Sequence, residues 1–297
     1  MRWEDFRRSE NVEDARGGGF TGGMPVGAGG LGIGGIIILA LIGWALGIDP
    51  SVLLGGLQDQ TTQSPSRYET PNSAGRPTDQ MGQFVAAVLG DTEDRWREIF
   101  AQSGNTYRPP KLRLFSGADA SACGFAQSAM GPFYCPNDQH VYLDTTFFRD
   151  LQTRFHGCSG KACEFAEAYV IAHEVGHHVQ NLLGILPKVK RLQSESDRAS
   201  ANHLQVQVEL QADCLAGVWA HHSQEKWKFI EPGDVEAAMQ TAAAIGDDRL
   251  QRQSQGYVVP DAFTHGSSAQ RVRWFTTGLK SGNLASCNTF EAARQSQ

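Results

Sequence analysis

The sequence has little positive charge and no dense run of lysines and arginines. Its 297 residues carry 26 Lys and Arg against 32 Asp and Glu, a formal net charge of −6. Proteins that hold nucleic acid by its phosphates need clustered positive charge, so we expect no nucleic-acid partner. The chain also lacks internal repeats and the composition of fibrous or disordered proteins. At this length, with 40% hydrophobic residues, it can bury a substantial core.

Charge is absent from residues 31–48, a run of apolar and Gly residues. At the rise of an α-helix this run comes close to spanning the hydrocarbon core of a bilayer, so we predict one transmembrane helix. Residues 1–30 precede it, which indicates an uncleaved signal anchor, because a cleavable signal peptide places its basic region directly before the apolar run. The expected contact of this segment is membrane lipid.

The flanks of this run predict its orientation. Four arginines lie before it, whereas the flank after it has no Lys or Arg until Arg67. By the positive-inside rule we expect residues 1–30 to form a cytoplasmic tail and the bulk of the chain to lie outside the cytoplasm.

All six cysteines follow the run, and an even number is compatible with disulfides in an oxidising compartment. Fifteen pairings are possible. Proximity in the sequence favours two disulfides, Cys123 with Cys135 and Cys158 with Cys163. This leaves Cys214 to pair with Cys287.

Residues 49–77 are rich in Gln, Ser, Thr, Gly and Pro, which predicts a flexible linker. Residues 78–297 are expected to form the folded domain. Apolar periodicity there predicts helices over residues 80–101, 164–183, 199–222, 234–245 and 268–279, with Pro187, Pro232 and Pro260 between them. Strands are predicted over residues 111–116 and 140–148. The predicted fold class is α+β, mostly helical with a small sheet, preceded by one transmembrane helix.

Chemistry is concentrated in one predicted helix. His173 and His177 are four residues apart, so their imidazoles project from one helix face toward a common point, as a tetrahedral Zn²⁺ requires. Glu174 can reach a metal-bound water without binding the metal, and is the candidate general base for a hydrolysis. Gly176 allows another segment to approach the helix closely. His178 points away from His177 and is predicted to be a polar surface residue.

A catalytic zinc site needs a third protein ligand. A metzincin would place a His six residues after His177, but that position is Leu183, which excludes the class. The alternative is an acid on the following helix. We predict that Glu209 binds Zn²⁺ and that Asp213 accepts a hydrogen bond from a ligand imidazole. Three residues stay as rivals for the third ligand: His203, Glu195 and Asp213 itself.

Hydrolysis also needs an electrophilic group for the oxyanion of the tetrahedral intermediate. The candidate is His265, in a turn before the last predicted helix, and Tyr257 is a weaker one. Asp247 and Asp248 could support such a site or be solvated, and we assign them no role.

Five segments together resemble a known family, the neutral zinc metallopeptidases of bacteria, which are small membrane-anchored proteins. The segments are FYCPNDQHVYLD at residues 133–144, AHEVGHHVQ at 172–180, ELQADCLAG at 209–217, IGDDRLQ at 245–251 and FTHGSSAQRVRWF at 263–275. The resemblance covers nearly the whole chain, including the tail and the apolar run. It implies a peptidase of the bacterial inner membrane whose catalytic domain faces the periplasm or the extracytoplasmic space.

The site of this family is similar to that of the gluzincins, including the membrane proteases that process prenylated proteins, where a Glu-x-x-x-Asp segment follows the zinc helix. The similarity implies a zincin-like fold with Glu209 as third ligand and Asp213 as its supporter. Those proteases also carry a His followed six residues later by an Arg, as His265 and Arg271 do here. This implies that His265 stabilises the transition state. The chain departs from them at Gly266, where they usually have Pro, and Arg271 is left without a role.

The combined prediction is zinc-dependent hydrolysis of peptide bonds by a membrane-anchored metalloendopeptidase. Glu174 would take the proton of the attacking water, and an extended peptide would pair with the predicted strand 140–148. The alternative from another class is a non-enzymatic, membrane-tethered interaction protein whose zinc site only braces the fold. A hydrolase of non-peptide bonds would share the same residues.

Overall fold

The computed structural model describes residues 1–17, 75–127 and 131–295. Within these ranges it contains a four-stranded sheet and a separate two-stranded hairpin. The four-stranded sheet has the order β1-β2-β6-β5 and consists of β1 (Val12–Asp14), β2 (Lys111–Phe115), β6 (His140–Asp144) and β5 (Phe133–Cys135). The first three strands run parallel, and β5 pairs antiparallel with β6. β5 is therefore an edge strand.

The hairpin consists of β3 (Ala118–Ser121) and β4 (Gly124–Gln127). The helices are α3 (Gln80–Gln102), α4 (Thr146–Thr153), α5 (Cys163–Leu182), α6 (Ile185–Ser194), α7 (Arg198–Trp227), α8 (Asp234–Ala244), α9 (Asp247–Gln255), α10 (Ser268–Ser281) and α11 (Thr289–Gln295). Among the described residues there are also three short 3₁₀ helices: η2 (Gly160–Ala162), η3 (Pro260–Ala262) and η4 (Leu284–Cys287). The predicted α+β class, mostly helical with a small sheet, is confirmed.

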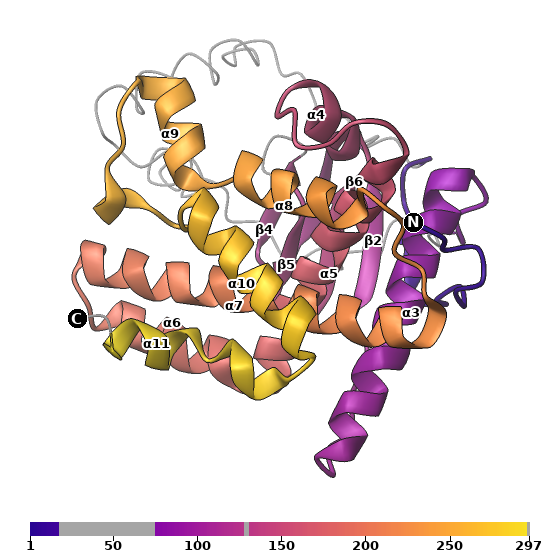
Figure 1. The fold of residues 1–297 in the computed structure, drawn as a ribbon, viewed down its shortest axis with the longest axis horizontal. Coiled ribbons are helices and arrows are strands. Elements are labelled where there is room, and N and C mark those ends of the chain that lie inside the picture. The colour runs from indigo at the N-terminus through magenta and orange to yellow at the C-terminus, as the bar shows by residue number, and fades with distance from the viewer. Residues whose placement is uncertain (18–74, 128–130, 296–297) are drawn as a thin grey trace, which may run out of the picture. The chain divides into compact units, whose positions relative to one another are not determined.

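Helix α5 lies at the centre of this arrangement, in contact with α3, α6, α7, α8 and β5 (Figure 1). It is buried on nearly all sides, which explains why its sequence is apolar around most of its circumference. Gly176 of α5 faces α7 so closely that a Cβ there would lie 3.0 Å from the backbone oxygen of Ala212. The predicted close approach at Gly176 is confirmed, and the helix it admits is α7.

Helices α7 and α10 also touch through their backbones (Figure 1). A Cβ at Gly278 of α10 would lie 1.9 Å from the backbone oxygen of Cys214, so only glycine fits. The disulfide Cys214–Cys287 further ties α7 to the chain that follows α10. Side chains of α10 are thereby held against those of α7.

All three predicted disulfides are present: Cys123–Cys135, Cys158–Cys163 and Cys214–Cys287. No cysteine is free. The predicted long helices are also confirmed, because α3, α5, α7, α8 and α10 cover the five predicted ranges with small differences at their ends.

The predicted strand 140–148 is wrong beyond Asp144, where α4 begins at Thr146. The carboxylate of Asp144 accepts hydrogen bonds from the backbone N–H groups of Thr146 and Gly117, at 2.8 and 3.0 Å, and this turns the chain out of the sheet. Pro187 does not lie between helices but in the first turn of α6, where a missing backbone N–H costs no helical hydrogen bond.

The folded unit is larger than predicted, because it includes residues 1–17 as well as the chain from residue 75 onward. Met1, Trp3, Phe6 and Val12 are buried in its core. Among the described residues no helix is both long and apolar enough to cross a bilayer. The predicted span 31–48, and all but the end of the predicted linker 49–77, lie outside the described residues and stay predictions.

Glu167 of α5 is a buried acid with a predicted effect on stability. Burial raises the pKa of its carboxyl to about 7, although Gln152 donates a hydrogen bond to it. Since this pKa lies above that of the unfolded chain, the folded protein binds the extra proton between pH 4.5 and 7 and loses stability as pH rises through that window.

We therefore expect Glu167→Gln to leave stability unchanged below pH 4 and to raise it by up to about 3 kcal/mol above pH 7. Denaturant unfolding of both proteins across pH 4–8 measures the difference. Glu236→Gln, at an exposed position of α8, is the control and should track the wild type at every pH. A constant offset for Glu167→Gln across the pH range would contradict the prediction.

Candidate metal centre

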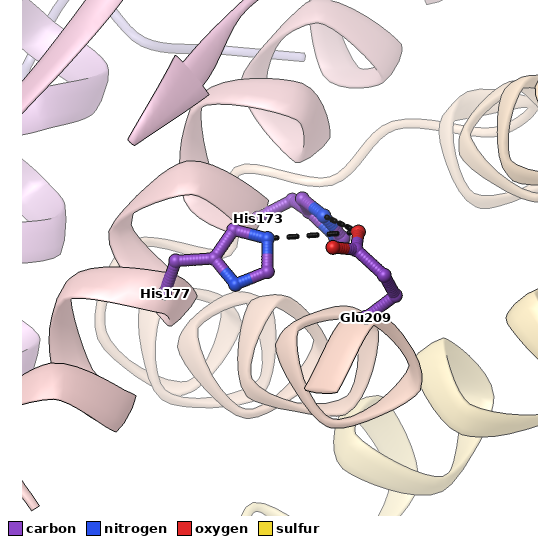
Figure 2. A group of neighbouring side chains, drawn as sticks. All are labelled: His173, His177 and Glu209. Atoms are coloured by element: carbon purple, nitrogen blue, oxygen red, sulfur yellow. Dashed lines mark hydrogen bonds and ion pairs between the residues drawn. The ribbon is translucent and has the colours of Figure 1, made fainter. Parts of the chain in front are cut away.

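Three side chains converge where α5 crosses α7. His173 and His177 lie one turn apart on α5, and Glu209 lies opposite them on α7 (Figure 2). The Oε2 atom of Glu209 is 3.3 Å from Nε2 of His173 and 3.6 Å from Nε2 of His177. Within the described parts of the chain these three form the group of His, Cys, Asp and Glu residues close enough to hold a metal ion together.

The spacing of these atoms suits zinc. Ligand atoms about 2.0–2.2 Å from one tetrahedral Zn²⁺ lie roughly 3.4 Å from each other. Both imidazoles present Nε2 to the centre, because each Nδ1 is engaged elsewhere, with Asp213 at 2.8 Å and with Gln180 at 2.8 Å.

The charge of the centre also suits a cation. Burial alone lowers the pKa of His173, but the carboxylates of Asp213 and Glu209 outweigh it and raise that pKa to about 10. The two acids therefore favour positive charge at this place, and a divalent metal satisfies the same demand. Glu209 is the predicted third ligand, and the structure places it where that role requires.

Asp213 lies at the centre of a buried network, as predicted for a residue that supports a ligand. Its Oδ1 accepts hydrogen bonds from Nδ1 of His173 and from the Tyr169 hydroxyl, at 2.8 and 2.6 Å. Arg271 of α10 donates to both oxygens of the carboxylate, each at 2.9 Å. Although burial opposes it, the Arg271 charge and His173 hold the pKa of Asp213 at about 2. Asp213 is therefore an anion that fixes the His173 ring.

This network supplies the role that the sequence left open for Arg271. Arg271 is 3% exposed and also donates to the Tyr169 hydroxyl at 3.2 Å. It contacts neither ligand histidine by a hydrogen bond, so it acts on the centre through Asp213.

Gln180 supports the second histidine, and sequence analysis missed it. Its Oε1 accepts from His177, and its Nε2 donates to the Val208 backbone oxygen and to the Gln211 side chain at 2.8 and 3.0 Å. The only signal was its position three residues after His177, which places both on one helix face. The amide thus ties the second ligand to α7.

His265 lies at the rim of the same cleft, in the loop before α10. One oxygen of Asp247 accepts hydrogen bonds from three consecutive backbone N–H groups, of Thr264, His265 and Gly266, at 2.6, 2.6 and 3.0 Å. Its other oxygen is 3.3 Å from Nδ1 of His265. This hydrogen bond outweighs burial and raises the pKa of His265. Asp247 is thus the residue that holds the His265 loop.

Asp248 fixes the next turn, because its Oδ1 accepts from the backbone N–H and the hydroxyl of Ser268, both at 2.7 Å. The two acids left unassigned in the sequence both organise this loop. A positive φ of 87° at Gly266 explains why Gly stands where the similar proteases usually have Pro, whose ring fixes φ near −65°.

The remaining candidates do not join the centre. His203 lines a different cavity, between α6, α7 and α11, and Glu195 is an exposed residue at the end of α6. Tyr257 is 62% exposed and does not line the cleft.

The surface prediction for His178 is wrong. Its side chain is fully buried, 3.0 Å from the Tyr134 hydroxyl and 2.7 Å from the Arg108 backbone oxygen. Burial lowers the pKa of His178 to about 4, so it is neutral and joins α5 to β5.

A cleft of about 870 Å³ opens over the three converging side chains. Glu174 lines it beside His173 and His177, and is 7% exposed. β5 and the residues that follow it form one wall, whereas β6 lies inside the sheet. The predicted peptide-binding edge 140–148 is therefore wrong, because β5 covers β6 on that side.

Comparison with known proteins agrees with this geometry. The model of a family described as "Putative neutral zinc metallopeptidase" matches residues 1–290. The chain belongs to this family. Zn²⁺ is accordingly the cofactor of the centre, and the zinc metallopeptidase family suspected from the sequence is confirmed.

Two relatives show how similar other members of the family are to this chain. Uncharacterized protein YpfJ of Escherichia coli strain K12 is 48% identical over 297 residues, covering 98% of this chain and 99% of that protein. Uncharacterized protein Mb2605 of Mycobacterium bovis is 40% identical over 264 residues, covering 84% of this chain and 85% of that protein. No solved structure matches.

Proposed function

We propose that this protein is a metalloendopeptidase that hydrolyses peptide bonds with water as the nucleophile. The observation that carries the proposal is the convergence of His173, His177 and Glu209 beneath a cleft that also presents Glu174. Three protein ligands leave a coordination position for water or substrate, as in catalytic zinc sites.

The residues at and around the metal centre have separate tasks in the proposed reaction. When bound, Zn²⁺ lowers the pKa of water and polarises a carbonyl. The Glu174 carboxylate takes a proton from the attacking water and passes it to the nitrogen of the leaving amine. The supports on Asp213 and Gln180 keep both ligand rings turned toward the centre during this exchange.

His265 stabilises the oxyanion of the tetrahedral intermediate. Its Nδ1 faces Asp247, so Nε2 is the nitrogen left to donate into the cleft. Because Asp247 raises the pKa of the ring, His265 carries a donor N–H on Nε2 over a wider pH range than an unpaired histidine does.

The β5 edge orients an extended peptide. Strand edges bind extended segments through backbone hydrogen bonds and take their side chains into neighbouring pockets. Aromatic side chains line the cleft on this side, among them Phe133, Phe147 and Phe155. We therefore expect substrates with an apolar residue near the scissile bond.

The alternative is a non-enzymatic interaction protein with a structural zinc site. Structural sites are closed by four protein ligands. Here three ligand residues lie at the base of a cleft that also presents an acid, and this favours an enzyme over that alternative.

Digestion of a peptide library by the full chain tests the proposal. We expect cleavage at internal bonds that is lost on treatment with a chelator and restored by added Zn²⁺. A Glu225→Gln variant, changed at an exposed position of α7, should cleave like the wild type. Absence of cleavage in Zn²⁺-loaded, folded protein would favour the structural alternative.

The role of His265 has its own test. We expect His265→Gln to lower kcat by about 10² to 10³-fold with little change in KM, because an oxyanion donor acts mainly in the transition state. Tyr257→Phe, which changes an exposed residue outside the cleft, is the matched control. Loss confined to KM would assign His265 to ground-state binding instead.

We further propose that the catalytic unit works outside the cytoplasm of a bacterial cell. The three disulfides support this location, because such bonds persist in oxidising compartments. Anchoring in the inner membrane depends on residues 31–48 and stays a prediction.

A further inference from the structure

The first residues of the chain are built into the catalytic unit as a strand of its sheet. β1 pairs parallel with β2 over Val12, Glu13 and Asp14. β1 thereby covers the edge of β2 that would otherwise present unpaired backbone groups. Trp3 packs edge-on against Phe84, with ring centroids 5.5 Å apart.

A buried acid on α3 receives this segment. Glu93 is 1% exposed, and its carboxylate accepts from the Arg7 guanidinium at 2.6 Å, the Ser9 hydroxyl at 2.5 Å and the Asn11 amide at 2.7 Å. Unpaired, a carboxylate buried to this extent would be strongly unfavourable. Arg97 of α3 lies 3.6 Å from the same carboxylate, and the polar side chains of residues 7–11 supply its hydrogen bonds.

Gly90 of α3 is shaped for the same contact. A Cβ there would lie 2.1 Å from the backbone oxygen of Arg7, and one turn earlier the Ala86 backbone oxygen accepts from the N–H of Ser9 at 2.8 Å. The helix therefore fits the backbone of this segment and not only its side chains.

The two ends of the gap between residues 17 and 75 lie close together in the folded unit. The backbone N–H of Asp14 donates to the backbone oxygen of Gly75 at 2.9 Å, and Arg16 binds the carboxylates of Asp14 and Asp79. A segment that crosses a bilayer once separates its flanks by about 30 Å of hydrocarbon. The two flanks of residues 18–74 are instead joined by a hydrogen bond.

We infer that residues 1–17 lie on the same side of the membrane as the catalytic unit, outside the cytoplasm with the disulfides. This inference replaces the predicted cytoplasmic tail, and with it the predicted single crossing of the bilayer by residues 31–48. That prediction was based on the tail arginines, but Arg7 pairs with Glu93 and Asp94, and Arg16 with Asp14 and Asp79. These two of the four arginines before residues 31–48 are thus held in ion pairs within the folded unit.

Cysteine labelling in intact spheroplasts tests the inference on the full chain. Asp5→Cys reports on the tail and Gln253→Cys on α9, both at exposed positions, and all six native cysteines are paired. We expect a membrane-impermeant maleimide to label both variants equally before permeabilisation. Equal labelling only after permeabilisation would place both positions in the cytoplasm and overturn the inference. Labelling of Gln253→Cys alone before permeabilisation would overturn the inference.

Limited proteolysis of the purified full chain tests the docking itself. We expect cleavage at Arg7 and Arg8 to be at least roughly tenfold slower in the wild type than in Gly90→Leu, whose side chain displaces the segment. Gln102→Leu, exposed on the same helix, should behave like the wild type. Equal rates in wild type and Gly90→Leu, or slow cleavage in both, would overturn the docked arrangement.

Discussion

We expect Glu174→Gln to lower the rate of peptide hydrolysis by about 10³-fold or more, while Zn²⁺ binding stays unchanged. The amide keeps the size and the hydrogen-bonding reach of the carboxylate but cannot take a proton at neutral pH. His173, His177 and Glu209 are untouched, so the ligand set stays complete. The loss is therefore expected in kcat.

Two measurements on the same sample separate catalysis from metal binding. Zn²⁺ content after dialysis should equal that of the wild type, and hydrolysis of a peptide found in the library digestion gives kcat and KM. Glu195→Gln, an exposed change at the end of α6, is the control for the substitution itself. If Glu174→Gln retains full activity, Glu174 is not the base, and if it loses Zn²⁺, Glu174 belongs to the ligand set.

Arg271→Met has the second largest expected effect, because it leaves the buried Asp213 carboxylate without its ion-pair partner. Removing one partner of a buried ion pair costs about 3–5 kcal/mol of stability. Asp213 is 0% exposed and also orients His173, so we expect Zn²⁺ affinity to fall by about 10 to 100-fold. Denaturant unfolding and competition with a zinc chelator measure the two losses.

A matched set of variants separates the two effects. Arg273→Met lies two residues further along α10, is exposed, and should change neither quantity. Arg271→Lys keeps the charge but not the two-pronged geometry, so it should restore part of both. Undiminished Zn²⁺ affinity in Arg271→Met would show that Arg271 has no positioning role.

A double replacement, Asp213→Leu with Arg271→Met, distinguishes support of the ligand from support of the fold. Replacing both members of a buried ion pair by apolar groups often restores stability. The His173 ring would still lack the acceptor for its Nδ1, so weak Zn²⁺ binding should persist.

The sequence by itself determined the features that depend on neighbours along one helix. His173, Glu174 and His177 are placed by the 3.6-residue repeat of α5 alone. Glu209 and Asp213 were predicted because they lie one turn apart on the next long helix, and the family resemblance agreed. The disulfide pattern followed from proximity for Cys123–Cys135 and Cys158–Cys163, where the short separation leaves few other partners.

Predictions from the sequence failed where the residue type is compatible with two different environments or two kinds of secondary structure. His178 is chemically the same as its neighbour His177, and only packing against Tyr134 shows that it is buried. Residues 145–148 are β-branched and aromatic and favour a strand, but hydrogen bonds to Asp144 begin a helix there instead.

Only the tertiary structure decided the supports of the site and the extent of the fold. Arg271 meets Asp213 across 58 residues, and the segment at Arg7 meets Glu93 across 86. Such contacts leave no periodic signal, because they depend on how α7 lies against α10 and how residues 7–11 lie against α3. Local spacing places the ligands on their helices, and long-range packing decides what holds them and that the first strand belongs to the sheet.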